Sequence, residues 1–159
     1  MKLADFVCLD AIIPELKAHS RDDAIVELVT ALDKAGKLGK NNCQKIIKAV
    51  VKRENQATTG MGKGIALPHV QHLVVKDVVA AVGQSSSGID FTALDKQLVY
   101  SVILLVSPAD NPDKHLQAME SIFRHLQSDR FRSFLRQSQT AEQIKDLLME
   151  ADANPVLKQ

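Results

Sequence analysis

The sequence predicts an α/β fold, a single-domain sandwich with a mixed β-sheet flanked by helices on both faces. Segments with helical periodicity occur before, between and after strand-like segments, which is typical of a layered α/β domain. Residues 99–106 are apolar on both faces, as in a central strand covered on two sides. A β-branched segment at residues 78–82, followed by turn-forming residues 85–88, predicts a hairpin in the middle of the chain.

The first third of the chain predicts a short strand at residues 11–16 and then two helices. Ser20 is an N-cap followed by acids in the first turn, where the helix dipole favours negative charge, and Gly36 ends that helix. Asn42 caps the second helix. The apolar face of this second helix carries Ile46, Ile47, Val50 and Val51.

The rest of the chain predicts a loop, short strands and three helices. Residues 56–64 are polar and glycine-rich, which indicates a loop, and Pro68 stops a short apolar strand at residues 65–67. The triplet Asn111-Pro112-Asp113 begins a long helix. A short helix with apolar residues at 131, 134 and 135 follows, and the capping box Thr140-Ala-Glu-Gln143 opens the last one.

Composition excludes several classes of function. The 159 residues include 20 Lys and Arg against 19 Asp and Glu, so the chain lacks the basic excess of a generic nucleic-acid binder. No apolar run approaches the roughly 18 residues of a membrane span, and the N-terminal stretch carries no cleavage signal. We therefore expect a cytoplasmic protein with no nucleic-acid partner and no direct membrane insertion. Cys8 and Cys43 form neither a disulfide framework nor a CxxC motif, and we expect both to be dispensable.

His69 is the first candidate for chemistry. It ends the run Thr59-Gly60-Met-Gly62-Lys-Gly64-Ile-Ala-Leu-Pro68-His69. Because proline fixes its own φ and disfavours helix at the preceding residue, the imidazole lies on a stiff, extended segment at a strand end. The three glycines allow backbone N–H groups to approach a bound anion closely. A histidine with a purely structural role fits the same residues.

His115 is the second candidate. It lies in the first turns of the helix that begins at Asn111 and shares a face with Met119, Ile122 and Leu126, so it points inward or into a cleft. A helix N-terminus attracts anions and disfavours the imidazolium, so a neutral histidine there can donate to phosphate. A histidine satisfied at the edge of the core is the alternative.

Arg53, at the end of the second helix, is the third candidate. Its planar fork suits a phosphoryl group. The alternative is a solvated charge near the last carbonyls of the helix.

The residue pattern argues against two other kinds of site. The glycine run does not match the nucleotide P-loop GxxxxGK[ST]. His69-Val-Gln-His72 offers an HxxH pair that could bind zinc with His115, but in a strand this spacing sends the two rings to opposite faces. We therefore expect neither a metal nor a cofactor.

The segment from Arg53-Glu54 through Thr58-Thr-Gly-Met-Gly-Lys-Gly-Ile-Ala-Leu-Pro-His69 resembles the phosphorylation-site signature of phosphotransferase system (PTS) EIIA proteins of the fructose/mannitol type, most closely the nitrogen-regulatory branch. The resemblance runs from Phe6 to about Met149 and includes His115, where the family carries its second active-site histidine. It implies one EIIA type-2 domain over residues 1–159, with its core at about 6–149. One departure is Val70, because the family commonly has glycine after the active histidine.

The resemblance implies that His69 accepts a phosphoryl group from a phosphocarrier protein of the HPr or NPr type. His115 and Arg53 would then support the transfer, and Thr59, Gly60, Gly62 and Gly64 would form a phosphate-binding loop. No nucleotide or metal is needed, because the donor is itself a phosphohistidine.

Three functions remain open for this site. Phosphorylation of His69 regulates binding to target proteins, or His69 relays phosphate to a cysteine of a IIB domain for sugar uptake. The third possibility is a small module that binds a phosphate-bearing ligand. The chain carries no attached IIB or membrane module, which favours regulation as an expectation.

Overall fold

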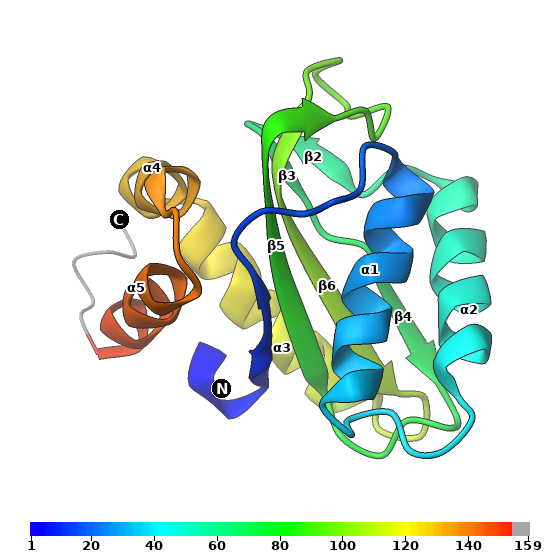
Figure 1. Cartoon of the computed structure of the whole chain (residues 1–159). Helices are drawn as coiled ribbons and strands as arrows, with labels where there is room; N and C mark the ends of the chain where they lie inside the picture. The colour runs from blue at the N-terminus through cyan, green and yellow to red at the C-terminus, as the bar shows by residue number, and fades with distance from the viewer. Residues whose placement is uncertain (154–159) are drawn as a thin grey trace.

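The structure, a computed structural model, describes residues 1–153 (Figure 1). Its helices are the 3-10 turn η1 (Leu3–Asp5) and the α-helices α1 (Arg21–Lys34), α2 (Cys43–Gln56), α3 (Pro112–Leu126), α4 (Asp129–Gln137) and α5 (Ala141–Ala153). Its strands are β1 (Val7–Ile13), β2 (Gly60–Gly62), β3 (Ile65–Ala66), β4 (His69–His72), β5 (Val79–Ile89) and β6 (Val99–Pro108).

The described strands form one six-stranded sheet in the order β1-β5-β6-β3-β2, with β4 also paired to β6. Strands β5 and β6 are antiparallel, and β2 is antiparallel to β3. Strand β1 runs parallel to β5, and both β3 and β4 run parallel to β6. The sheet is therefore mixed, and β6 is its central strand.

Two hydrophobic cores lie on the opposite faces of this sheet. Alternate residues of β6 point into each core: Val102, Leu104 and Val106 pack with α1 and α2, whereas Ile103 and Leu105 pack with α3, α4 and α5. Figure 1 shows the same division, with α1 and α2 on one face and the other three α-helices on the opposite face. These features confirm the predicted fold class and the predicted central strand at residues 99–106.

A break in the strand next to β6 positions the candidate site. Residues on both sides of Leu67–Pro68 keep one register with β6, since Ala66 pairs with Val102 and His69 pairs with Leu105. Pro68 has no N–H to donate, although its carbonyl accepts the N–H of Leu105 at 3.0 Å. The chain thus passes along β6 as two short strands, and His69 begins the second.

Three predicted segments differ in detail from the structure. The first strand lies at Val7–Ile13 rather than at residues 11–16. The strand therefore includes the exposed Asp10, which precedes the predicted strand. Its pairing with β5 is irregular between Val7 and Ile12. Residues 85–88 are not a turn but part of β5, because pairing with β6 resumes at Ile89 after a local irregularity. The predicted loop at residues 56–64 also contains β2.

The helix boundaries follow the predicted caps, with two differences in the bonds. Ser20 Oγ accepts the N–H of Asp23, and Gly36 adopts a φ of 75° just after α1. Asn42 does occupy the N-cap position of α2, but its amide donates to the Leu38 carbonyl instead of capping the helix. Thr140 caps Gln143 as predicted, whereas the Gln143 side chain accepts the N–H of Gln139.

Candidate functional site

His69 lies in a small pocket at the start of β4. The pocket has a volume of about 200 Å³, and the His69 side chain is half-buried in it. Its lining residues are Arg53, Thr58, Thr59, Met61, Leu67, His69, Leu94, Met119 and Phe123. They come from the end of α2, the segment that runs from Thr58 to His69, the β5–β6 connection and α3, so four separate parts of the chain meet at this pocket.

The Leu67 carbonyl fixes the tautomer of His69. Nδ1 of His69 lies 2.8 Å from this oxygen. Because a carbonyl oxygen only accepts hydrogen bonds, Nδ1 carries the proton and donates it. In the neutral ring the lone pair is then on Nε2, which is the nitrogen left to act as a nucleophile.

The surroundings of His69 also keep its ring neutral. Burial lowers the pKa of His69 below 6.5, and the nearby positive charge of Arg53 lowers it as well. The hydrogen bond to Leu67 and the charge of Glu54 act in the opposite direction but do not reverse the shift. The nucleophilic neutral form therefore persists to lower pH than it would in a free imidazole.

His115 is buried in the first turns of α3 and faces His69. The two ring centroids are 5.7 Å apart. Nδ1 of His115 lies 2.8 Å from Oγ of the fully buried Ser107, which follows the apolar run of β6. Burial lowers the pKa of His115, and the charge of His69 contributes to the same direction. His115 thus provides a second neutral imidazole beside the pocket.

Arg53 lies where it can both contact a carbonyl at the end of α2 and reach an anion in the pocket. One N–H of its Nη1 donates to the Ala57 carbonyl at 3.0 Å, just beyond the end of α2. The side chain also lines the His69 pocket. A guanidinium has five N–H donors, so this bond leaves most of them to contact an anion.

The glycine-rich segment meets the pocket through one of its four predicted phosphate-binding residues. Of the four predicted loop residues, Thr59 lines the pocket, whereas Gly60, Gly62 and Gly64 do not. The N–H groups of Thr59 and Gly60 already donate, to Glu54 and to the Thr58 hydroxyl. Gly60 instead permits a close approach, because a Cβ there would lie 2.8 Å from the Cβ of Ala93.

Sequence reasoning did not assign roles to several residues of the site. The Leu67 carbonyl and the Ser107 hydroxyl were missed because their roles depend on backbone path and strand pairing. The apolar lining residues Leu94, Met119 and Phe123 carry no chemical signal in the sequence. Glu54 had a signal, since it stands next to Arg53 at the start of the signature segment.

Other parts of the described chain offer fewer reactive groups. Three larger pockets among the described residues, of about 360, 490 and 580 Å³, are lined by neither histidine nor cysteine. Within residues 1–153, no group of three or more His, Cys, Asp or Glu side chains is arranged to hold a metal ion. None of the described helices has the length and apolar character that crossing a membrane requires.

Comparisons with known proteins bear on this site. The chain is 32% identical over 148 residues to the nitrogen regulatory protein of Bradyrhizobium diazoefficiens, covering 93% of this chain and 95% of that protein. It is 31% identical over 152 residues to the PTS system fructose-specific EIIABC component of Bacillus subtilis, covering 96% of this chain. The chain spans only 24% of the length of that second relative.

Solved structures show the same fold. The nitrogen regulatory protein IIA-Ntr from Neisseria meningitidis superposes with a TM-score of 0.82 at 22% identity, over 92% of this chain and 98% of that one. The IIA mannitol structure from Escherichia coli has a TM-score of 0.74 at 21% identity, over 89% and 97% of the two chains.

The similarity also extends to a whole family. Residues 6–151 match the family described as "Phosphoenolpyruvate-dependent sugar phosphotransferase system, EIIA 2", and this segment contains Arg53, His69 and His115. The chain therefore belongs to the EIIA type-2 family of the phosphoenolpyruvate-dependent sugar phosphotransferase system.

Proposed function

We propose that this protein is a phosphoryl carrier that accepts a phosphoryl group on Nε2 of His69 and acts as a regulator controlled by its phosphorylation state. The donor is a phosphohistidine on a carrier protein of the HPr or NPr type. The observation that carries the proposal is the bond from Nδ1 of His69 to the Leu67 carbonyl, since it leaves Nε2 as the nucleophile.

The transfer needs no proton to leave His69. The Nε2 lone pair attacks phosphorus, the P–Nε2 bond forms, and the P–N bond to the donor histidine breaks. Meanwhile the Nδ1 proton stays on its bond to Leu67. Because the donor and acceptor are both phosphohistidines, neither a nucleotide nor a metal has to supply energy.

Arg53 and His115 are the groups best placed to stabilise the transferred phosphoryl. The transition state spreads negative charge over three equatorial oxygens, so positioned donors lower its free energy. Arg53 lines the pocket with a permanent positive charge, and His115 lies with its ring centroid 5.7 Å from that of His69. In this proposal Thr59 contributes to the pocket wall and the glycines shape the backbone behind it.

The destination of the phosphoryl group is the second part of the proposal. A phosphoryl on His69 adds about two negative charges to a pocket with an apolar rim, which changes its fit to a partner without a change of fold. Similarity to nitrogen regulatory proteins at 32% identity supports regulation. The alternative is relay to a IIB domain, because a related solved structure is a complex of IIA mannitol with phosphorylated IIB mannitol.

His69 is expected to be the acceptor. His69→Ala should lose all acid-labile phosphate after incubation with phosphoenolpyruvate, enzyme I and an HPr-type carrier, as measured by mass spectrometry of the intact protein. His72→Ala is the matched control, because His72 ends the same strand but lies outside the pocket, and it should be phosphorylated normally. Phosphate retained by folded His69→Ala would refute the assignment. A wild type that never gains phosphate would favour the ligand-binding module.

Arg53→Gln and His115→Ala are each expected to slow phosphorylation by about 10²–10³-fold without abolishing it, since each removes one donor to the transition state. Arg53→Gln should also raise the pKa of His69, because the charge of Arg53 helps to lower it. A time course of phosphorylation measures the rate, and an NMR titration of His69 measures its pKa. Arg130→Gln, outside the pocket on α4, is the control. Wild-type rates in both single variants would show that other groups stabilise the transfer.

Phosphorylation is expected to change which proteins bind. Phosphorylated wild type, unphosphorylated wild type and His69→Ala are compared as baits in a pull-down. The proposal predicts that some proteins bind the phosphorylated wild type differently from the two unphosphorylated baits. These proteins should not belong to a sugar permease. Rapid transfer of phosphate to a IIB cysteine with accompanying sugar uptake would instead establish the relay.

A further inference from the structure

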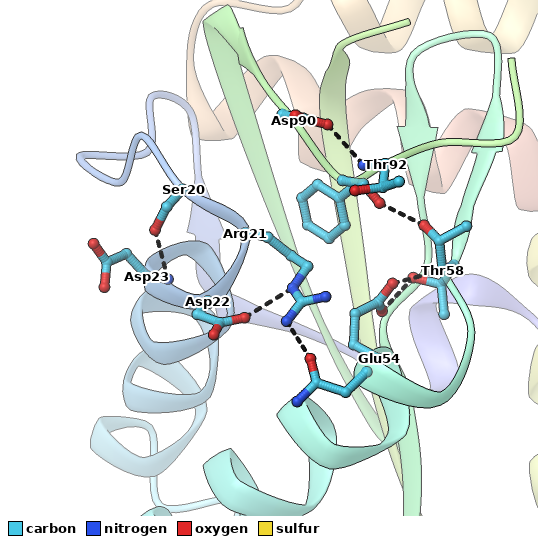
Figure 2. Close-up of polar contacts among 11 residues, drawn as sticks. Ser20, Arg21, Asp22, Asp23, Glu54, Thr58, Asp90 and Thr92 are labelled. Atoms are coloured by element: carbon cyan, nitrogen blue, oxygen red, sulfur yellow. Dashed lines mark hydrogen bonds and ion pairs between the residues drawn. The ribbon is translucent and has the colours of Figure 1, made fainter. Parts of the chain in front are cut away.

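Glu54 is a buried carboxylate in the last turn of α2, with 2% of its surface exposed. Its Oε2 accepts the N–H of Thr59 at 2.6 Å, and its Oε1 accepts the hydroxyl of the same residue at 2.7 Å. Figure 2 shows the Glu54 side chain pointing from the helix toward the segment at Thr58, with both bonds dashed. Among the described residues, no lysine or arginine forms an ion pair with this carboxylate.

Burial of a charge at this position is costly unless hydrogen bonds compensate it. Hydrogen bonds to an ionised carboxylate are about twice as strong as those between neutral groups. Two of them on one residue therefore hold Thr59 firmly against the end of α2.

The hydrogen bonds continue from Thr59 to the imidazole. The Thr59 carbonyl accepts the N–H of Leu67 at 3.2 Å. The Leu67 carbonyl in turn accepts Nδ1–H of His69 at 2.8 Å. Leu67 lies between β3 and β4, where its N–H bonds Thr59 and its carbonyl bonds His69, whereas the Pro68 carbonyl is the one that bonds Leu105 of β6.

We propose that Glu54 is a positioning residue for His69, which acts through Thr59 and Leu67 to fix the orientation and tautomer of the imidazole. This inference rests on the proposed function of His69 as phosphoryl acceptor. Glu54 lines no part of the pocket itself and contacts no transferred group. Its contribution is to hold the Leu67 carbonyl where that oxygen keeps the proton on Nδ1.

A purely structural role makes a different prediction, and the chain contains a matched control for it. Glu27 on α1 also uses its carboxylate to accept backbone N–H groups, from Lys17 at 3.0 and 3.1 Å and from Ala18 at 3.0 Å. Those bonds fix the segment before α1 and do not lead to His69. Loss of either carboxylate removes a backbone clamp, but only loss of Glu54 disturbs the imidazole.

The test compares Glu54→Ala with Glu27→Ala. In the unphosphorylated protein, ¹⁵N NMR of the His69 ring should show Nδ1 protonated and Nε2 free in the wild type. In Glu54→Ala the two nitrogen signals should move toward each other as the tautomers exchange. The phosphorylation rate at saturating carrier should fall on the order of ten- to a hundredfold because the nucleophile is misplaced. The half-saturating carrier concentration should not change, and Glu27→Ala should match the wild type in all three.

Protonation of His69 does not explain such a loss of rate. The charge of Glu54 raises the pKa of His69, so its removal lowers that pKa and keeps the ring neutral. If Glu54→Ala does not fold, Glu54→Gln and Glu27→Gln replace the pair. The isosteric amide retains one acceptor oxygen and should give smaller changes in the same direction.

Wild-type ring-nitrogen signals together with wild-type rates in a folded Glu54 variant would overturn the inference. A failure of the proposed function looks different, because then no protein, wild type included, gains phosphate. The nitrogen signals of His69 still decide the role of Glu54 in that case.

Discussion

The hydrogen bond between Nδ1 of His69 and the Leu67 carbonyl is the interaction on which the geometry of the site depends. Along this segment the Pro68 carbonyl bonds to Leu105 of β6, whereas the Leu67 carbonyl accepts the imidazole N–H of His69. Here the register with β6 is the same before and after the break, so the sheet stays intact around it. The central pairing thus coexists with a backbone carbonyl that accepts from His69, and the proposed chemistry of His69 depends on that carbonyl.

The electrostatics of the site follow from its place between two structural layers. His69 is half-buried at the sheet, His115 is buried at the start of α3, and Arg53 ends α2 on the other face. Burial lowers the pKa of both histidines, so two neutral rings and one permanent cation surround the pocket. In the proposed transfer the neutral imidazoles provide a nucleophile and an N–H donor, and the guanidinium attracts the phosphoryl oxygens.

The sequence predicted those features whose physical causes are local. The α3 start at Asn111 and the central strand at residues 99–106 depend on capping and on apolar pattern, and both are present. The three site residues could be named from the signature segment and its spacing, and the structure brings them together. The turn predicted at residues 85–88 was wrong because their composition favours a turn, whereas in the structure they belong to strand β5, which pairs with β6. The Leu67 acceptor could not be predicted, since a backbone carbonyl has no signal in the sequence.

The most direct measurement is the site of the P–N bond in the phosphorylated protein. Long-range ¹H–¹⁵N correlation spectra of the fully phosphorylated, histidine-labelled protein identify which ring nitrogen of His69 carries phosphorus. The account predicts phosphorus on Nε2, with Nδ1 still protonated and bound to the Leu67 carbonyl. Phosphorus on Nδ1 would contradict it, because that nitrogen would then have to lose the proton that orients the ring.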